Sequence, residues 1–126
     1  MNQRTTLLSG AMFGGIGVAL GAVGAHALKP ALLENNKLEV YETALRYQVV
    51  HALALLIAGA LMVHVQNKLL RMAASCWAGG ILLFSGSLYV LSFISITAVA
   101  FLTPVGGLLF LAGWVLLFLA VLRTGR

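Results

Sequence analysis

The feature that most constrains this chain is a series of long apolar stretches without charge. Four of them are present, at about residues 7–28, 47–65, 72–93 and 104–122. Each is close to the roughly 20 apolar residues that a helix needs to cross a bilayer. A soluble domain of this size could not hide so much apolar surface, and its charged fraction would be about 25% rather than the 9% found here. We therefore predict an all-α membrane protein, a single domain whose four transmembrane helices form an antiparallel bundle.

The charges that the chain does carry lie beside the apolar stretches. Its eight Lys and Arg outnumber its acidic residues and give a formal net charge of +5, but they are scattered along the sequence. They form no basic face of the kind that binds nucleic acid, and membrane proteins place cations in this way at the ends of their spans. Cys76 is the only cysteine, so no intrachain disulfide can form. The expected partner is the lipid bilayer and not nucleic acid.

The first apolar stretch has the alternative of being a secretory signal peptide. Arg4 would be its basic start, and Ala25-His26-Ala27 its small-x-small cleavage pattern. The stretch is longer than the apolar core of a usual signal peptide. We therefore expect it to be retained as the first span.

Glycine recurs in the first span at helical spacing. A helix face without side chains lets another helix approach closely, and such packing is how helices associate in lipid. We expect six glycines of the first and fourth spans to pack in this way: Gly14, Gly17, Gly21, Gly24, Gly106 and Gly107. A second stripe of small residues, Gly15, Ala19 and Ala22, ends at His26. The spacing does not match a nucleotide-binding loop, which would also follow a strand.

Most of the remaining charge lies in residues 28–46, between the first and second spans. We predict a short amphipathic segment there, lying at the membrane interface. Pro30 ends or restarts a helix, and Asn36 with Glu39 three residues later indicates an N-cap with a near-capping box. Glu42 and Arg46 stand in the i,i+4 order that supports a helix.

Two starting points are open for the fourth span. Thr103 as N-cap, followed by Pro104 at the first helical position, favours a start at residue 104. Alternatively the helix begins near Thr97 and is kinked at Pro104. We prefer the first, with residues 94–102 forming a tight turn.

The distribution of Lys and Arg predicts the orientation in the membrane. One side of the predicted topology carries five of them: Arg4, Lys68, Arg71, Arg123 and Arg126. The other side carries Lys29, Lys37 and Arg46. The positive-inside rule therefore predicts that both termini are cytoplasmic.

With that topology, polar residues of all four spans gather at the outer leaflet. The candidate cluster comprises His26, Thr43, Tyr47, Gln48, His51, Tyr89 and Thr103. Thr43, Tyr47 and His51 follow one another at i, i+4 and i+8, so they share one helical stripe.

Three interpretations of the cluster compete. The preferred one is a buried hydrogen-bond network that fixes helix register, because polar groups in lipid must find partners. The second is a small binding pocket or permeation route, because intramembrane ionisable groups often mark functional sites. The third is a haem or metal site with His26 and His51 as paired ligands, for which no carboxylate or thiolate stands nearby at depth. No nucleophile motif for hydrolysis is present.

Four motifs carry a resemblance to a known family. They are Gly21-Ala22-Val23-Gly24-Ala25-His26-Ala27-Leu28-Lys29, Tyr41-x-Thr43-Ala44-x-x-Tyr47-Gln48-x-x-His51-Ala52-Leu53-Ala54-Leu55, Phe84-Ser85-Gly86-Ser87-Leu88-Tyr89-x-Leu91 and Thr103-Pro104-Val105-Gly106-Gly107-x-x-Phe110-x-x-Gly113-Trp114. In these the chain resembles the small bacterial membrane proteins grouped as domain of unknown function 423, of UPF0382 type, whose eukaryotic relative is transmembrane protein 256. The resemblance implies a four-helix protein of the bacterial plasma (inner) membrane and no assigned activity.

Two functions follow as expectations. The first is a non-enzymatic structural or accessory bundle that self-associates, or joins a membrane complex, through its glycine-rich helices. The second is a binder or transporter of a small molecule or ion that uses the His/Tyr cluster. If the first function is correct, no cofactor is expected.

Overall fold

The computed structural model describes residues 1–125, and Arg126, part of the predicted orientation signal, lies outside the described residues. The described chain is helical, without strands, and two of its four candidate spans, the first and the third, begin and end within four residues of the predicted bounds. Its elements are α1 (Gln3–Ala25), α2 (Lys29–Glu34), α3 (Leu38–Leu61), α4 (Lys68–Gly80), the π-helical turn η1 (Ile81–Ser85), α5 (Gly86–Leu91), α6 (Thr97–Ala100) and α7 (Leu102–Thr124). Four helical segments are long and apolar enough to cross a membrane: α1, α3, the continuous segment Lys68–Leu91, and Thr97–Thr124. The predicted fold class, an all-α protein with four candidate membrane spans, is confirmed.

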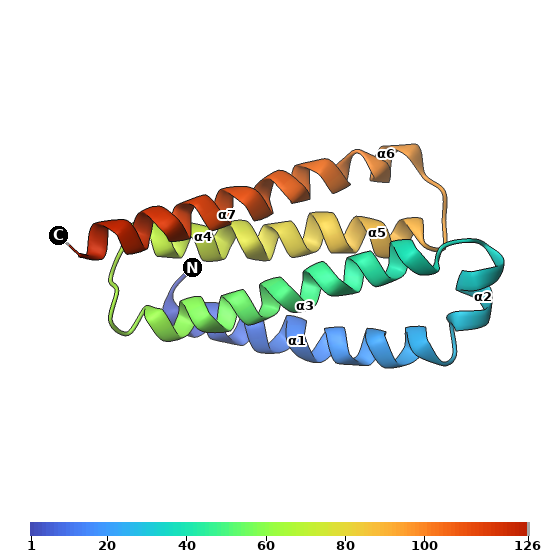
Figure 1. Ribbon diagram of the computed structural model, residues 1–126, viewed down its shortest axis with the longest axis horizontal. Coiled ribbons are helices and arrows are strands. Elements are labelled where there is room, and N and C mark those ends of the chain that lie inside the picture. Colours follow the sequence, from blue (N-terminus) through green and yellow to red (C-terminus); the bar gives the residue numbers. More distant parts are fainter. Residues whose placement is uncertain (126) are drawn as a thin grey trace.

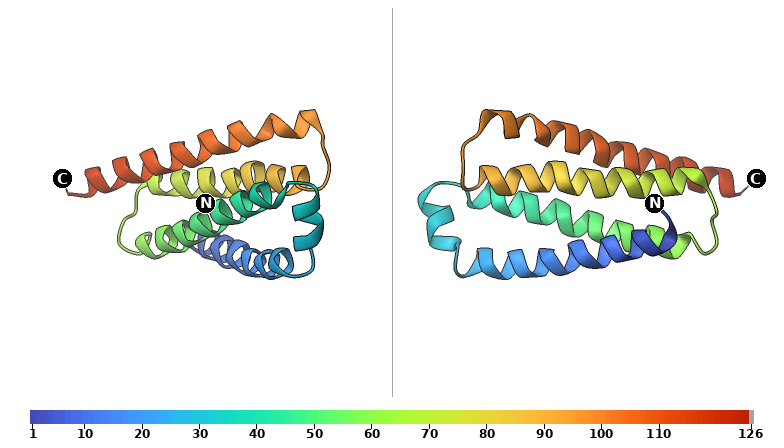
Figure 2. Two further views of the ribbon diagram at one scale, coloured as in Figure 1. Left: turned by 45° about the vertical axis from the view of Figure 1, so that its right-hand side comes forward. Right: turned by 180° about the vertical axis from the view of Figure 1, so that it is seen from behind.

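The helices are arranged as two antiparallel pairs (Figures 1 and 2). In one pair α1 packs against α3, and in the other α7 packs against α4 and η1. The pairs meet where α3 contacts α4, η1 and α5. Helix α1 therefore has a long helical neighbour on one side only. The short helix α2 closes the end of the bundle between α1 and α3 (Figure 1).

The core lies where the two pairs meet. Its largest fully buried side chains include Trp77, Leu55 and Leu70. Large apolar side chains are exposed along the outside of α7, with Leu108 and Phe118 both 67% exposed. Such a surface would be unstable in water and suits the hydrocarbon of a bilayer.

The second span begins earlier than predicted. Helix α3 starts at Leu38, nine residues before the expected residue 47, because the charged turn that contains Glu39 and Glu42 is already part of the long helix. The other predicted boundaries differ less, and α1 starts at Gln3 because the Asn2 side chain accepts a hydrogen bond from Thr5 N at 2.8 Å.

The predicted N-cap at Asn36 is wrong. Asn36 has a left-handed backbone (φ 55°) and ends α2 rather than starting α3. The amide of Lys37 donates to Leu32 O at 2.8 Å, and the amide of Asn36 donates to Leu33 O at 3.2 Å. This is the Schellman pattern, in which asparagine is the usual substitute for glycine at the left-handed position.

The fourth span combines features of both predicted starts. Residues Thr97–Ala100 are helical, as in the alternative, and α7 then begins at Leu102 without a side-chain cap. Thr103 is therefore not the N-cap, because its hydroxyl is hydrogen-bonded to Ser87 instead. Pro104 lies in the first turn of α7, where its missing N–H breaks no helical hydrogen bond.

Candidate functional site: a line of polar ties between the helices

Gln48 joins three helices inside the bundle. It lies on α3 and is 2% exposed. Its Oε1 accepts a hydrogen bond from the Tyr89 hydroxyl of α5 at 2.7 Å, and its Nε2 donates to the Phe13 carbonyl of α1 at 2.8 Å. Gly17 of α1 lies beside this side chain, and a Cβ built on it would be in ordinary contact with Gln48 Nε2, at 3.6 Å.

His51 joins α3 to α7, and its hydrogen bonds fix its protonation. The ring is 3% exposed. Trp114 Nε1 lies 3.0 Å from His51 Nε2, and because an indole N–H can only donate, Nε2 must be the unprotonated nitrogen. Nδ1 then carries the proton and donates to Tyr47 O at 2.7 Å. The ring is a neutral imidazole with both nitrogens already engaged.

An aromatic cluster surrounds His51. The ring stacks on Phe110 with centroids 3.7 Å apart and planes 11° from parallel. Tyr47, Phe84 and Trp114 complete a groove of about 520 Å³ between α3 and α7. Sequence reasoning missed Phe84 and Phe110 as neighbours of His51. The only sequence feature that could have indicated them is that both lie on the faces of their helices that carry glycines.

Three further hydrogen bonds made by side-chain hydroxyls connect the helices. Ser85 Oγ, in η1, donates to Ala44 O of α3 at 2.7 Å, and the Tyr41 hydroxyl donates to Leu20 O of α1 at 2.5 Å. The hydroxyls of Ser87 and Thr103 lie 2.5 Å apart and connect α5 to α7. Each bond supplies a partner that lipid could not.

The structure divides the predicted cluster instead of gathering it at one place. Gln48 and Tyr89 form one tie, His51 forms another, and Thr103 belongs to a third. Thr43 is only partly buried and its side chain has no hydrogen bond within residues 1–125. His26 is exposed where α1 ends.

His26 and His51 do not lie together. Gly24, near the end of α1, packs against Tyr41 of α3. Ten residues separate Tyr41 from His51, which is about 15 Å along a helix. The geometry therefore does not bring together the two ligands of the haem or metal alternative. Within residues 1–125, no three side chains of His, Cys, Asp and Glu are grouped as a metal site would require.

The hydrogen bonds of Gln48 and His51 lie near the middle of the helices that carry them. Gln48 and His51 lie midway along α3, since this helix runs from Leu38 to Leu61. Trp114 likewise lies midway along α7. The placement of these residues at the outer leaflet stays a prediction.

Five of the six predicted packing glycines lie against other helices. Built Cβ atoms on Gly17 and Gly21 would lie 3.1 Å and 3.3 Å from Val49 and Leu45 of α3, and one on Gly24 would collide with Tyr41. Gly106 lies against the backbone of Phe84, and Gly107 is in ordinary contact with the same residue. Gly14 faces open space. Four close glycine contacts lie outside the predicted set, at Gly10, Gly59, Gly80 and Gly113.

One buried polar atom has no partner in the described chain. Trp77 Nε1, on a side chain that is 1% exposed, makes no hydrogen bond. Its ring is packed against Gly113, where a Cβ would collide with it. The close approach of α4 and α7 at this point leaves no space for a ligand or a water beside the indole nitrogen.

Comparison with known proteins identifies the family. Residues 20–107 match the family described as "Protein of unknown function (DUF423)". A UPF0382 membrane protein of Haemophilus influenzae is 46% identical over 114 residues, which is 90% of this chain and 89% of the relative. The UPF0382 inner membrane protein YgdD of Escherichia coli K12 is 40% identical over 136 residues, with 100% and 95% coverage. The UPF0382 membrane protein SAB0533 of Staphylococcus aureus is 37% identical over 126 residues, with 96% and 98% coverage.

No solved structure matches the chain. The relatives' names state a membrane location and no activity. The match covers all four motifs that carry the resemblance except the last seven residues of the fourth. The chain therefore belongs to the DUF423 family of UPF0382 membrane proteins.

Proposed function

We propose that the protein is a non-enzymatic membrane subunit that pairs with a second copy of itself through the outer face of α1. One observation carries the proposal. Helix α1 has a long helical neighbour on one side only, and its opposite face carries, beyond the exposed Leu8 of its first turns, a stripe of small, exposed residues: Ala11, Gly15, Ala19 and Ala22.

Helical geometry places these residues away from α3. Gly10, Gly17 and Gly24 recur every seven residues and contact α3. At 100° per residue, Gly15 and Ala19 point about 160° away from Gly17. A Cβ built on Gly15 would meet nothing within 4 Å.

The outer face of α7 provides the contrast. It carries Phe101, Leu108, Leu111 and Phe118, each more than 60% exposed, as expected for a surface that acyl chains cover. Small residues offer lipid little contact area but let a second helix come close, and van der Waals contact is what drives helix association in lipid. The small face of α1 therefore suits a helix better than lipid.

A second copy is the simplest occupant. Two copies inserted with the same topology present parallel α1 helices, so each small residue can meet its own counterpart across a two-fold axis. Val18, 74% exposed, stands beside the small stripe and would fill the space next to it.

The test is a pair of matched substitutions. Ala19→Leu replaces a methyl by an isobutyl group at the proposed interface, and Ala112→Leu makes the same change on the exposed face of α7. Overpacking an interface costs about 1–3 kcal/mol, so Ala19→Leu should weaken pairing roughly 5- to 150-fold. Förster transfer between labelled copies in vesicles, read over a dilution series in lipid, measures this. Equal effects of both substitutions, or a monomeric wild type, would contradict the proposal.

Disulfide crosslinking gives an independent readout. Single cysteines introduced along α1 in a Cys76→Ser background should crosslink in membranes with helical periodicity, strongly at Gly15 and Ala19 and not at the α3-facing Gly17. A flat profile along α1 would argue against a specific interface.

We propose that both termini face the cytoplasm. Both lie at the end of the bundle that carries the α3–α4 loop (Figure 1), together with Arg4, Lys68, Arg71 and Arg123. The positive-inside rule supports this placement. A reporter that is active only in the cytoplasm should be active when it is fused to the C-terminus. Activity of a reporter that works only in the periplasm would show the opposite orientation.

The groove over His51 favours a second candidate, a binder of an apolar membrane-resident molecule. Its floor is formed by His51 and Phe110, and it opens toward lipid past Tyr47, which is 41% exposed. The ring nitrogens of His51 are already bonded, so stacking on the aromatic rings would have to hold the ligand. Mass spectrometry of the protein extracted from membranes, with Leu108→Trp to fill the groove, tests this candidate.

A further inference from the structure

The ionised side chains divide between the two ends of the bundle. All three carboxylates, Glu34, Glu39 and Glu42, lie on α2 and the first turns of α3. The opposite end, formed by the start of α1, the α3–α4 loop and the end of α7, carries four basic side chains and no carboxylate in the described chain. Within residues 1–125 its cations thus have no acidic partner.

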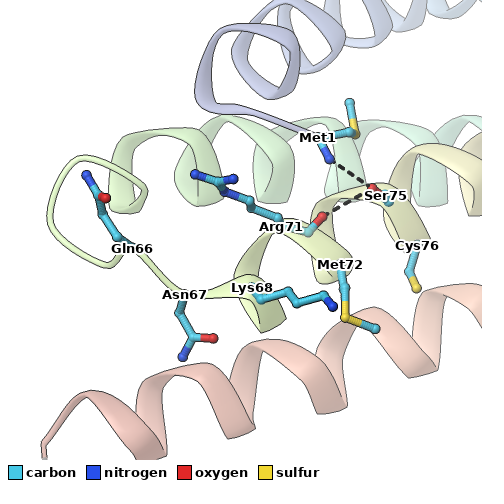
Figure 3. A pocket seen from close by; sticks show the side chains of 8 residues that line it. All are labelled: Met1, Gln66, Asn67, Lys68, Arg71, Met72, Ser75 and Cys76. Atoms are coloured by element: carbon cyan, nitrogen blue, oxygen red, sulfur yellow. Dashed lines mark hydrogen bonds between the residues drawn. The ribbon is translucent and has the colours of Figure 1, made fainter.

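Two of these cations line an open pocket. Lys68 and Arg71 lie in the first turns of α4, and the pocket beside them has a volume of about 730 Å³. Gln66 and Ser75 add an amide and a hydroxyl to its wall (Figure 3). The Met1 nitrogen donates to Ser75 Oγ at 3.4 Å, and this contact holds the first residue beside the middle of α4.

The other wall of the pocket is apolar. Met72, 43% exposed, and the partly buried Cys76 continue from Lys68 along α4 toward the middle of the bundle (Figure 3). The pocket is therefore polar and basic at the end of the helices and apolar where it enters the span. A phospholipid has the same order of groups from headgroup to acyl chain.

We infer that this pocket binds the headgroup of an anionic phospholipid. Lys68 and Arg71 contact the phosphate, the Gln66 amide bonds the polar headgroup, and an acyl chain lies along Met72 and Cys76. Arginine and lysine are the residues that recognise phosphate, arginine in a bidentate manner. Basic pockets beside membrane spans bind anionic headgroups by this chemistry.

The positive-inside rule alone does not explain the arrangement. That rule asks for cations near the ends of the spans, and Arg4 and Arg123 satisfy it on the outside of the bundle without lining the pocket. It does not require two cations to share a pocket with a hydroxyl, an amide and an apolar wall. The apolar wall also distinguishes a lipid from free phosphate, which would gain nothing from Met72.

The experiment compares two double variants with equal charge loss. Lys68→Gln/Arg71→Gln removes both cations of the pocket, and Lys29→Gln/Lys37→Gln removes two cations from the other end. Each is purified and placed in nanodiscs of phosphatidylcholine with or without phosphatidylglycerol. Native mass spectrometry counts retained phosphatidylglycerol, and thermal unfolding measures the stabilisation that it gives.

Each cation near an anionic lipid surface is worth about fivefold in affinity. We therefore expect the pocket variant to lose roughly 25-fold in its preference for phosphatidylglycerol, and the control to keep the wild-type preference. Lys29, Lys68 and Arg71 are exposed and Lys37 is only partly buried, so folding should persist in both variants. Ser75→Asp, which adds a carboxylate to the pocket without removing a cation, should also abolish the preference.

Two outcomes would overturn the inference. One is an equal loss in both double variants, which would show a general effect of charge. The other is full competition by inorganic phosphate at the concentration of the lipid phosphate, which would identify a site for the free anion. Pairing through α1 is measured on separate variants, so either proposal can fail without the other.

Discussion

Replacing Gln48 by leucine tests whether the polar ties hold the bundle together. The substitution keeps the approximate volume and removes both amide groups from a side chain that is 2% exposed. Phe13 O loses its extra donor but keeps the helical hydrogen bond from four residues later. Tyr89 loses the only acceptor of its hydroxyl among the described residues, which lay at 2.7 Å.

The cost of Gln48→Leu comes mainly from the Tyr89 hydroxyl, which loses its hydrogen-bond acceptor. A buried polar group left without a partner costs about 1–3 kcal/mol, whereas measured hydrogen bonds between membrane helices average about 0.6 and reach about 1.7 kcal/mol. We therefore expect Gln48→Leu to lower the free energy of unfolding by about 1–2 kcal/mol. Tyr89→Phe leaves the Gln48 oxygen without a donor and should cost a similar amount.

The double variant Gln48→Leu/Tyr89→Phe separates this explanation from a packing effect. It leaves no orphaned group, so its cost should fall below the sum of the single costs by about 0.6–1.7 kcal/mol. Reversible unfolding in mixed micelles, titrated with a denaturing detergent, measures all four proteins. Thr43→Val is the matched control, because it removes a hydroxyl that has no hydrogen bond in the described chain, and it should change stability little. Additivity within about 0.3–0.5 kcal/mol would refute the reasoning.

Three further predictions use the same unfolding measurement. Gly106→Ala places a Cβ against the backbone of Phe84, which cannot move aside, and should lower the free energy of unfolding by about 1–3 kcal/mol. In the control Gly14→Ala the new Cβ meets nothing within 4 Å, so stability should stay the same or rise by up to about 1 kcal/mol. Asn36→Val forces a β-branched residue into a left-handed backbone (φ 55°), so it should cost about 1–2 kcal/mol and loosen the turn between α2 and α3. His51→Ala removes a stacked ring and the acceptor of an indole N–H, so we expect a loss of about 3–5 kcal/mol, and wild-type stability would exclude a structural role.

The four spans were predictable because lipid imposes a simple rule. A helix must satisfy its backbone internally and show apolar side chains outside, and that requirement is visible as long uncharged stretches. The ends of the spans were less predictable. The charges of Glu39 and Glu42 indicate an interface, but a helix does not have to end at an interface, and α3 already includes both residues.

The sequence indicated which polar residues would matter, but not which residues they would be hydrogen-bonded to. Gln48 and His51 stand out because they interrupt an apolar stretch. Their partners Tyr89 and Trp114 lie 41 and 63 residues away, and pairing over such distances depends on which faces of the helices meet. The spacing also placed His26 beside His51 on the assumption that α3 begins at residue 47. A shift of nine residues moves His51 by about 13 Å along the helix relative to His26.

The bonding inside the bundle bears on where this protein can recognise other molecules. The hydroxyl, amide and imidazole groups of Gln48, His51 and Tyr89 are all bonded between helices, so recognition falls to the surface. Two surfaces differ from the apolar covering that lipid alone would need, the small face of α1 and the basic pocket beside α4. The pocket reaches the start of α1 through Met1, which lines it just before α1 begins. A headgroup held there would touch both helix pairs and brace α1, whose only long helical neighbour is α3. Loss of the lipid should therefore loosen α1 against the rest of the bundle, and hydrogen exchange of α1 should rise in the pocket variant while that of α7 stays unchanged.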